Sequence, residues 1–248
     1  MSHDFKNHKL GVKRTPAHVL AKVPHVLDYV DLAATLPLVA DTCSYTKRLP
    51  SGLWGMLGND QYGDCVLVAI ANGKNTQAAN AGKPTTSYTT DQVLGWYSAV
   101  TGFKKSDPST DNGTDPVEAL DWAVKQGLVA AYGQVNLQDD SHVAAALYLF
   151  GGIQIALDFP EAWQSTSNWD VTSSAIVGGH MTVLSGYDAT VNHDVETWAE
   201  IVRLTNRARK KYGQAGYVII TNEWLAANGK TIQGLDIAGL KAASALVR

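Results

Sequence analysis

A polar, glycine-containing loop that runs straight into an apolar segment constrains this chain more than any other feature. Residues 58–65 read GNDQYGDC and residues 66–71 read VLVAIA. The change in texture predicts a buried helix that begins at Cys65. Because a helix N-terminus carries partial positive charge and unpaired N–H groups, it favours a thiolate over a thiol. Cys65 is therefore a candidate nucleophile, and the alternative is a small apolar side chain packed at a helix start.

Length and charge exclude several classes of protein. The chain has 248 residues and a formal net charge of −3, which suits a globular protein better than a nucleic-acid binder. No apolar run is long enough to span a membrane, and residues 1–6 lack the apolar core of a signal peptide. Two cysteines, Cys43 and Cys65, are too few for a disulfide framework and fit a reducing compartment. We expect a cytoplasmic protein with no nucleic-acid or membrane partner.

Composition divides the chain into three segments. Residues 1–50 are mildly basic and punctuated by prolines, so we expect an extended arm with one short helix near residues 26–36. Such an arm packs across its own domain or onto a partner. Residues 51–228 read as one compact domain, and residues 229–248 as a C-terminal helical tail.

Within the domain, helical patterns precede strand patterns. Caps and apolar spacing predict helices that begin near residues 65, 91, 116 and 141. Alternating or continuous apolar runs then predict strands at 152–159, 180–187, 196–204 and 216–221, followed by a short helix at 237–247. This order indicates an α+β architecture, a helical half followed by an antiparallel sheet half, with a cleft between them as the natural place for a site.

A cysteine nucleophile needs a base, and His180 is the best placed of the seven histidines. It follows Gly178 and Gly179 and begins an apolar strand, so it lies at a sheet edge where it could face the cleft. The alternative is an ordinary strand-edge histidine bonded to backbone. Asp and His residues elsewhere lack the clustered spacing of metal ligands, so we expect no metal and no cofactor.

In collinear order, residues 54–224 resemble the papain-like cysteine peptidases. In that family a helix begins at the nucleophilic cysteine, and a polar residue six positions earlier, here Asn59, donates to the oxyanion. Residues 112–128 (NGTDPVEALDWAVKQGL) resemble the glycine-rich substrate loop and the helix after it. Residues 180–187 (HMTVLSGY) resemble the catalytic-histidine strand, and residues 196–199 (ETWA) stand where the family has Asn-Ser-Trp-Gly.

The resemblance implies a two-lobed papain-like fold and a hydrolase of peptide or protein substrates. Cys65 would attack the carbonyl carbon, His180 would move the proton, and Asn59 with the Cys65 N–H would hold the oxyanion. Glu196 would orient His180, with Thr197 and Asp188 as the alternatives for that role. Because Asn59 is about one methylene shorter than the family's glutamine, Gln61 is an alternative donor.

Residues 9–11 (KLG) and 54–60 (WGMLGND) resemble a group of bacteriophage-encoded and bacterial papain-fold proteins. This resemblance supports a second hypothesis, a catalytically silent structural component of a phage virion, associated with its capsid or tail. The arm would then contact other virion proteins, and the location would be the host cytoplasm or the virion.

Two remaining features have plain structural interpretations. The basic side chains between residues 203 and 211 read as a solvated face. Four tryptophans read as core or cleft wall, with one shielding the histidine and its partner; they are Trp163, Trp169, Trp198 and Trp224.

Overall fold

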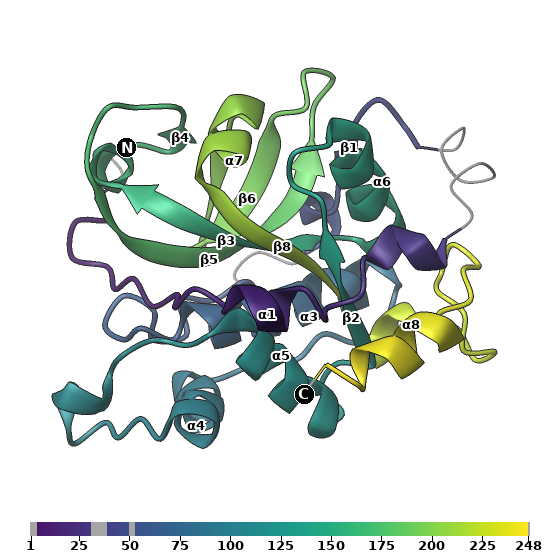
Figure 1. Cartoon of the computed structure of the whole chain (residues 1–248), viewed down its shortest axis with the longest axis horizontal. Coiled ribbons are helices and arrows are strands. Elements are labelled where there is room, and N and C mark those ends of the chain that lie inside the picture. The colour runs from purple at the N-terminus through teal and green to yellow at the C-terminus, as the bar shows by residue number, and fades with distance from the viewer. Residues whose placement is uncertain (1–3, 31–38, 50–52, 248) are drawn as a thin grey trace.

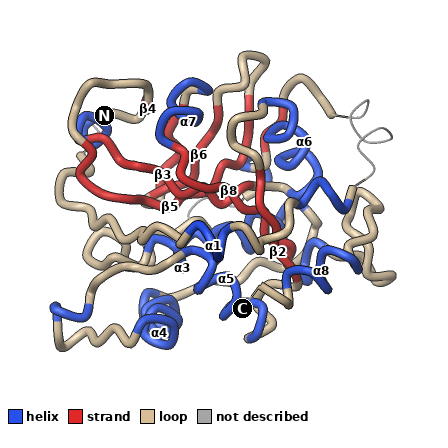
Figure 2. The backbone as a smooth tube through the Cα atoms, viewed as in Figure 1, coloured by secondary structure: helices blue, strands red, loops and turns tan. Residues whose placement is uncertain are grey.

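Helices and strands separate into two layers in the computed structural model, which describes residues 4–30, 39–49 and 53–247. Figure 1 shows α3, α4 and α5 below the sheet, and Figure 2 shows the same division by element type. The α+β class and the helical-then-sheet order predicted from the sequence are confirmed. In the three described segments, no helix is long and apolar enough to cross a membrane.

The first long helix, α3 (Cys65–Asn80), begins at the predicted cysteine and is buried on nearly every side. Its first half, residues 65–71, is apolar on every side, which is typical of a helix inside a core. Polar side chains of its second half bond to the sheet and to the end of α6: Gln77 Nε2 donates to the carbonyls of Phe150 (2.7 Å) and Ile219 (2.6 Å). Gln77 Oε1 in turn accepts from the N–H of Thr221 at 3.0 Å. These bonds fix α3 against the sheet and thereby fix the position of Cys65.

Local capping explains why the other helices begin where they do. Thr89 and Gln92 form a reciprocal capping box, while Asp115 and Asp139 accept bonds from N–H groups of the helices that follow them. The helices are α4 (Thr90–Thr101), α5 (Pro116–Lys125), α6 (Asp140–Phe150), α7 (Asn206–Tyr212) and α8 (Ala238–Ser244).

One sheet of eight strands has the order β2-β8-β3-β5-β6-β7-β4, with β1 paired to β5. All pairs are antiparallel except β4 with β7. The strands are β1 (Cys43–Ser44), β2 (Ala131–Val135), β3 (Ile153–Pro160), β4 (Asn168–Trp169), β5 (Ile176–Tyr187), β6 (His193–Thr197), β7 (Glu200–Leu204) and β8 (Gly213–Ile220). One face packs on α3, α4 and α5, and the other packs on α6 and α7.

The single strand predicted over residues 196–204 is wrong, because the chain reverses at Trp198 and Ala199. These two residues have φ values of 43° and 58° and join β6 to β7 in a two-residue hairpin. Such turns normally use Asn or Gly at both positions, since positive φ strains other residues. The turn has no sequence signal, and it places Trp198 at the end of the sheet beside β5.

The basic run is ion-paired rather than simply solvated, which corrects the expectation for residues 203–211. Arg203 pairs with Asp188, and Arg207 pairs with Asp170. Arg209 is fully buried, where its guanidinium donates to His193 Nε2 and to an oxygen of Asp140. A buried arginine needs such partners, because unpaired charge is costly away from water.

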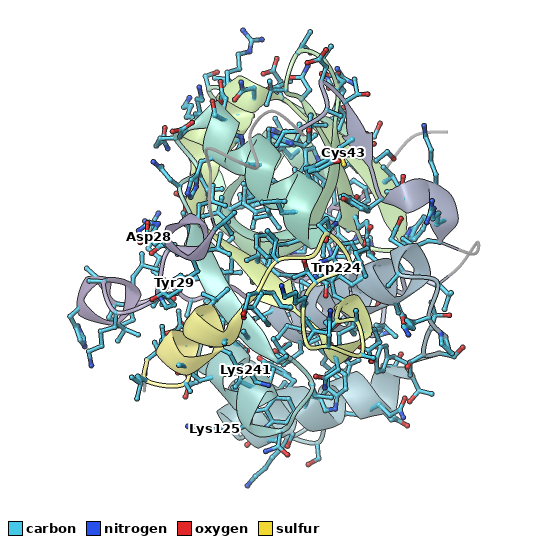
Figure 3. All side chains as sticks on the ribbon, turned by 90° about the vertical axis from the view of Figure 1, so that its right-hand side faces the viewer. Asp28, Tyr29, Cys43, Lys125, Trp224 and Lys241 are labelled. Atoms are coloured by element: carbon cyan, nitrogen blue, oxygen red, sulfur yellow. The ribbon has the colours of Figure 1, made fainter. Side chains whose placement is uncertain are left out.

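The N-terminal arm packs across its own domain. It contains α1 (Ala17–Leu20) and a 3-10 helix, η1 (Val26–Tyr29); the rest of the helix predicted at 26–36 lies largely outside the described residues. In Figure 1 the arm, drawn in purple, runs between the sheet and the helical layer. Figure 3 shows Tyr29 beside α8, the yellow helix that carries Lys241.

Candidate active site

Cys65 is 1% exposed and lies at the start of α3, under the arm residues that run between β5 and the loop before α5. The space that these arm residues fill is called the groove below. Backbone N–H groups of Met181 and Gly11 point at its sulfur. Burial nevertheless raises the pKa of the Cys65 thiol to about 12, because desolvation outweighs these hydrogen bonds and the nearby Asp64 charge adds to it. The sulfur therefore lies beside the peptide bond that joins His180 to Met181, and it is a neutral thiol in this conformation.

His180, on β5, is held by three neighbours that come from β3 and from the hairpin between β6 and β7. Its Nε2 lies 2.7 Å from Thr197 Oγ1, and its ring stacks on Trp198 with centroids 4.1 Å apart and an interplanar angle of 14°. Phe159 packs edge-on against the same ring. Burial, with a smaller effect of the His8 charge, lowers the pKa of His180 to about 3, so the imidazole is neutral.

The contact with Thr197 engages Nε2 of His180, so Nδ1 is the nitrogen that could act as a base. A neutral imidazole has one donor nitrogen and one acceptor nitrogen. If Nε2–H donates to Thr197 Oγ1, the lone pair is on Nδ1, which has no hydrogen-bond partner among the described residues. In that tautomer Nδ1 can accept a proton; because the Thr197 hydroxyl can donate as well as accept, the contact itself fixes the ring orientation and not the tautomer.

The structure gives Glu196 a different place from the one expected for it. Its carboxylate oxygens both lie 3.0 Å from Thr76 Oγ1 on α3, and burial raises its pKa to about 8. Neighbouring strand residues point to opposite faces, so Glu196 faces α3 while Thr197 faces His180. Asp188, the other alternative, pairs with Arg203 on the outer part of the sheet. Of the three candidates, Thr197 alone contacts the histidine ring.

The expected oxyanion donors lie in the loop before α3. Asn59 is buried, and its Nδ2 donates to the carbonyl of Tyr62 at 3.1 Å. Its amide also lowers the pKa of Asp64, although burial raises that pKa more strongly, to about 8. Gln61 is exposed and bonds to Asp60. Asn59 thus braces the loop in this conformation, and its role toward an oxyanion stays a prediction.

A segment of the arm occupies the groove directly over Cys65. The Val12 N–H donates to the carbonyl of Gly179 at 3.0 Å, and the Gly11 carbonyl accepts from Thr114 N–H at 2.7 Å. Lys13 N–H donates to the Thr114 carbonyl at 2.9 Å. The arm is therefore pinned on both walls, by the β5 residue next to His180 and by the loop before α5.

Three glycines make this close approach possible. A Cβ on Gly11 would overlap the carbonyl of Gly63, and a Cβ on Gly113 would overlap the carbonyl of Gly11. Backbone atoms cannot move aside as flexible side chains do, so the three peptides pack against one another only without side chains. Gly113 also has a φ of +74°, which favours glycine.

The arm presents the wrong group to the nucleophile for cleavage. The Gly11 N–H faces the sulfur, while the Gly11 carbonyl is bonded to Thr114. Attack by a thiolate requires an accessible carbonyl carbon in line with the sulfur. The bound arm therefore covers Cys65 without offering it a carbonyl to attack, so it blocks the site and is not cleaved there.

Sequence reasoning missed two features of this site. Gly11 stands in the family-like motif of residues 9–11, but its contacts, Gly63 and Gly113, lie about 50 and 100 residues away in the chain. Asp64 is completely buried next to Cys65 and was not singled out. The one local signal for a close backbone contact is that Gly11 is the single glycine of residues 1–50.

No protein-family model matches the sequence, and no curated protein matches it either. The fold is similar to solved structures that cover most of the chain. Xylellain, a cysteine protease from Xylella fastidiosa, has a TM-score of 0.60 at 13% identity, over 87% of this chain and 97% of that one. Procathepsin L 3 of Tenebrio molitor larval midgut has a TM-score of 0.59 at 14% identity, over 84% of this chain and 76% of that one.

Stem bromelain precursor is a third similar structure, with a TM-score of 0.58 at 11% identity over 88% of this chain and 84% of that one. At such low identities the similarity establishes the fold alone. It nevertheless agrees with the arrangement of helix, sheet and groove described above. The chain therefore has the fold of the papain-like cysteine proteases.

Proposed function

We propose that this protein is a cysteine hydrolase of peptide bonds, kept inactive by its own arm. The observation that carries the proposal is the setting of His180: Thr197 and Trp198 fix its ring, and its Nδ1 has no hydrogen-bond partner among the described residues. The N–H of Met181, the next residue, points at the Cys65 sulfur. A buried ring nitrogen without a hydrogen-bond partner is costly, which favours a chemical role for His180 over simple packing. The similar solved structures include cysteine proteases, which supports the same reading.

The chemistry follows from the groups present once the arm has left. Departure of the arm brings the His180 ring and the Cys65 sulfur within hydrogen-bond reach; the thiol proton then passes to Nδ1, and the sulfur bonds to the carbonyl carbon of the substrate. The resulting oxyanion is stabilised by the Cys65 N–H at the helix start and by the Asn59 amide. The carbon–nitrogen bond then breaks as His180 returns the proton to the amine. Water, deprotonated by His180, hydrolyses the thioester and restores the thiol.

The arm explains why the groups are inactive in this conformation. Burial holds the pKa of Cys65 at about 12 and that of His180 at about 3, so proton transfer between them is strongly uphill. Solvent entering the groove would move both values toward their ordinary range. Displacement of the arm is therefore the step that we expect to create activity.

The test compares full-length variants on a pool of synthetic peptides, with products identified by mass spectrometry. We expect Gly11→Ala, whose new Cβ disturbs the packed glycines, to cleave peptides, and Gly11→Ala/Cys65→Ala to be inactive. Gly95→Ala is the matched control, because its Cβ would meet nothing within 4 Å. Equal inactivity of the first two variants, with Cys65 shown to be accessible, would refute the hydrolase.

A second candidate function is the catalytically silent structural component, for example one carried on a phage particle. The observation that favours it is the complete burial of Cys65 under the arm, together with the Asn59 amide bonded within its own loop. A silent protein would need neither group. Under this proposal Cys65→Ala leaves particle assembly and infectivity unchanged, and particles purified without this chain would exclude it.

A further inference from the structure

One side chain of the arm binds a carboxylate in the wall of the groove. Arg14 Nη2 lies 2.8 and 2.6 Å from the two oxygens of Asp158. Asp158 is on β3 opposite Gly179, and its neighbour Leu157 pairs with His180. The carboxylate therefore lies within the same stretch of paired strands that carries the candidate base.

Asp158 has a rigid setting that does not depend on the arm. Gln214 Nε2 on β8 donates to one of its oxygens at 2.8 Å. The Asp158 side chain is only 27% exposed, whereas that of Arg14 is 70% exposed. An ion pair with so exposed an arginine contributes little to folding. The pair therefore contributes little to the stability of the fold, and the carboxylate keeps its bond from Gln214 when Arg14 is absent.

A cavity of about 130 Å³ lies beside this pair. Its lining includes Arg14 and Thr15 from the arm, Pro116 from α5, Ala156 from β3 and Tyr217 from β8. Ala156 and Asp158 lie on the same face of β3, because strand residues alternate. The cavity is apolar near α5 and is lined toward Asp158 by Gln214, which bonds to that carboxylate; this arrangement suits a side chain with an aliphatic stem and a cationic head.

Charge along the arm agrees with that arrangement. Residues 6–22 contain five lysine or arginine side chains and no acidic one. Thr15 also bonds to a carboxylate on the opposite wall, with its Oγ1 2.6 Å from Asp115. The arm segment that fills the groove is therefore positively charged, and one of its charges pairs with the carboxylate of Asp158.

We infer that Asp158 determines substrate specificity by binding an arginine or lysine side chain of the peptide, at the place that Arg14 fills when the arm is bound. The inference rests on the proposed function, because it takes peptides as the molecules that replace the arm. When the arm leaves, Asp158 loses its cation and keeps the bond from Gln214. A basic side chain restores the charge-assisted hydrogen bonds, whereas a neutral side chain of the same shape leaves the carboxylate less well solvated.

Binding is measured first, in full-length Gly11→Ala/Cys65→Ala, which requires no chemistry. The probe is a fluorescent peptide of residues 9–15 (KLGVKRT) with either arginine or its uncharged isostere citrulline at the sixth position. We expect the arginine peptide to bind about two- to fivefold more tightly, the range for a partly exposed ion pair. Asp158→Asn should abolish the preference. The matched control Glu161→Gln removes one exposed carboxylate outside the groove and should leave the preference unchanged.

Hydrolysis is measured second, in Gly11→Ala, with a peptide pool that varies one position among arginine, citrulline, leucine and glutamate. Arginine-selective binding without any hydrolysis would refute the proposed function and leave the inference standing. Hydrolysis without a preference for arginine would overturn the inference and leave the function standing. Equal binding of the two probe peptides, or binding of neither, also overturns it.

A charge swap covers the case in which Asp158→Asn fails to fold. Arg14→Asp should release the arm and speed alkylation of Cys65, and Arg14→Asp/Asp158→Arg should restore protection. Failure of the double variant to restore protection, when the Arg14→Asp variant is folded, contradicts recognition by charge at this position.

Discussion

Replacing Gly11 with alanine should convert Cys65 from a protected thiol into a reactive one. The new Cβ would overlap the Gly63 carbonyl, which is backbone and cannot move aside, so the arm must move away from the groove. This movement removes the Gly11 and Val12 contacts with the groove and admits water. The loop before α3 and the β5 strand keep their own bonds, so the domain itself should remain folded.

The pKa of Cys65 gives the expected size of the effect. At a pKa of about 12, the thiolate fraction at pH 7 is ~10⁻⁵. A released thiol with an ordinary pKa of ~8.5 has a fraction of ~3 × 10⁻², about 3,000-fold more. Intrinsic nucleophilicity falls as the pKa falls, by about 25- to 60-fold over this range. The net increase in alkylation rate is therefore on the order of 10²-fold, before any gain in steric access.

The assay is iodoacetamide labelling at pH 7, followed over time by mass spectrometry of peptides that contain each cysteine. Cys43 is a built-in reference, because it is a free, partly buried thiol whose pKa burial raises to about 11. In the natural chain we expect Cys65 to label more slowly than Cys43. In Gly11→Ala we expect Cys65 to label at least about 100-fold faster than Cys65 does in the natural chain. Gly95→Ala should label like the natural chain. Rapid labelling of Cys65 in the natural chain, or unchanged labelling in folded Gly11→Ala, would show that the arm does not control the thiol.

Three further predictions concern groups around the site. In a Gly11→Ala background, Thr197→Val should lower kcat at least about tenfold, because it removes the hydroxyl that holds the His180 ring; a positioned base contributes ~10²–10⁴ in all. Thr197→Asn should restore kcat, and equal kcat for all three proteins contradicts the positioning role. Folding raises the pKa of Glu196 from 4.5 to about 8, so the native state binds its proton more tightly and stability falls as pH rises through that window. Glu196→Gln should therefore make the fall in Tm between pH 5 and pH 8 smaller than in the natural chain. Part of the fall should remain, because burial raises the pKa of Asp64 in the same direction. An unchanged fall in Tm refutes this prediction. Ala199→Gly should stabilise the fold by about 0.5–1 kcal/mol in urea unfolding, since it relieves the positive φ; destabilisation would show that the turn is unstrained.

Much of the helical half could be predicted because its signals are local. A polar loop before Cys65, a capping box at Thr89 and the Asp-Pro start of α5 all act within a few residues of the helix that they begin. The alternating apolar run of β3 is equally local. The family resemblance then ordered these elements into the fold that the structure shares with papain-like cysteine proteases.

The parts that could not be predicted depend on contacts across the chain. Trp198 and Ala199 give no sign of a turn, so the sequence predicts one strand where the structure has a hairpin. The family resemblance implied Glu196 beside His180, with Thr197 as an alternative, and Thr197 is the residue found there. Likewise nothing near Gly11 indicates that it packs on Gly63 and Gly113. Packing of this kind is set by the tertiary fold, which local patterns do not encode.

The most direct test of a latent cysteine hydrolase is to trap its covalent intermediate. Full-length Gly11→Ala is mixed with an excess of a peptide ester, quenched in acid within seconds, and its intact mass is measured. We expect the mass to increase by one acyl group, located on Cys65 by peptide mapping, and His180→Ala to prevent that increase. An unmodified Cys65 in a folded variant whose thiol reacts freely with iodoacetamide would contradict the proposed hydrolase.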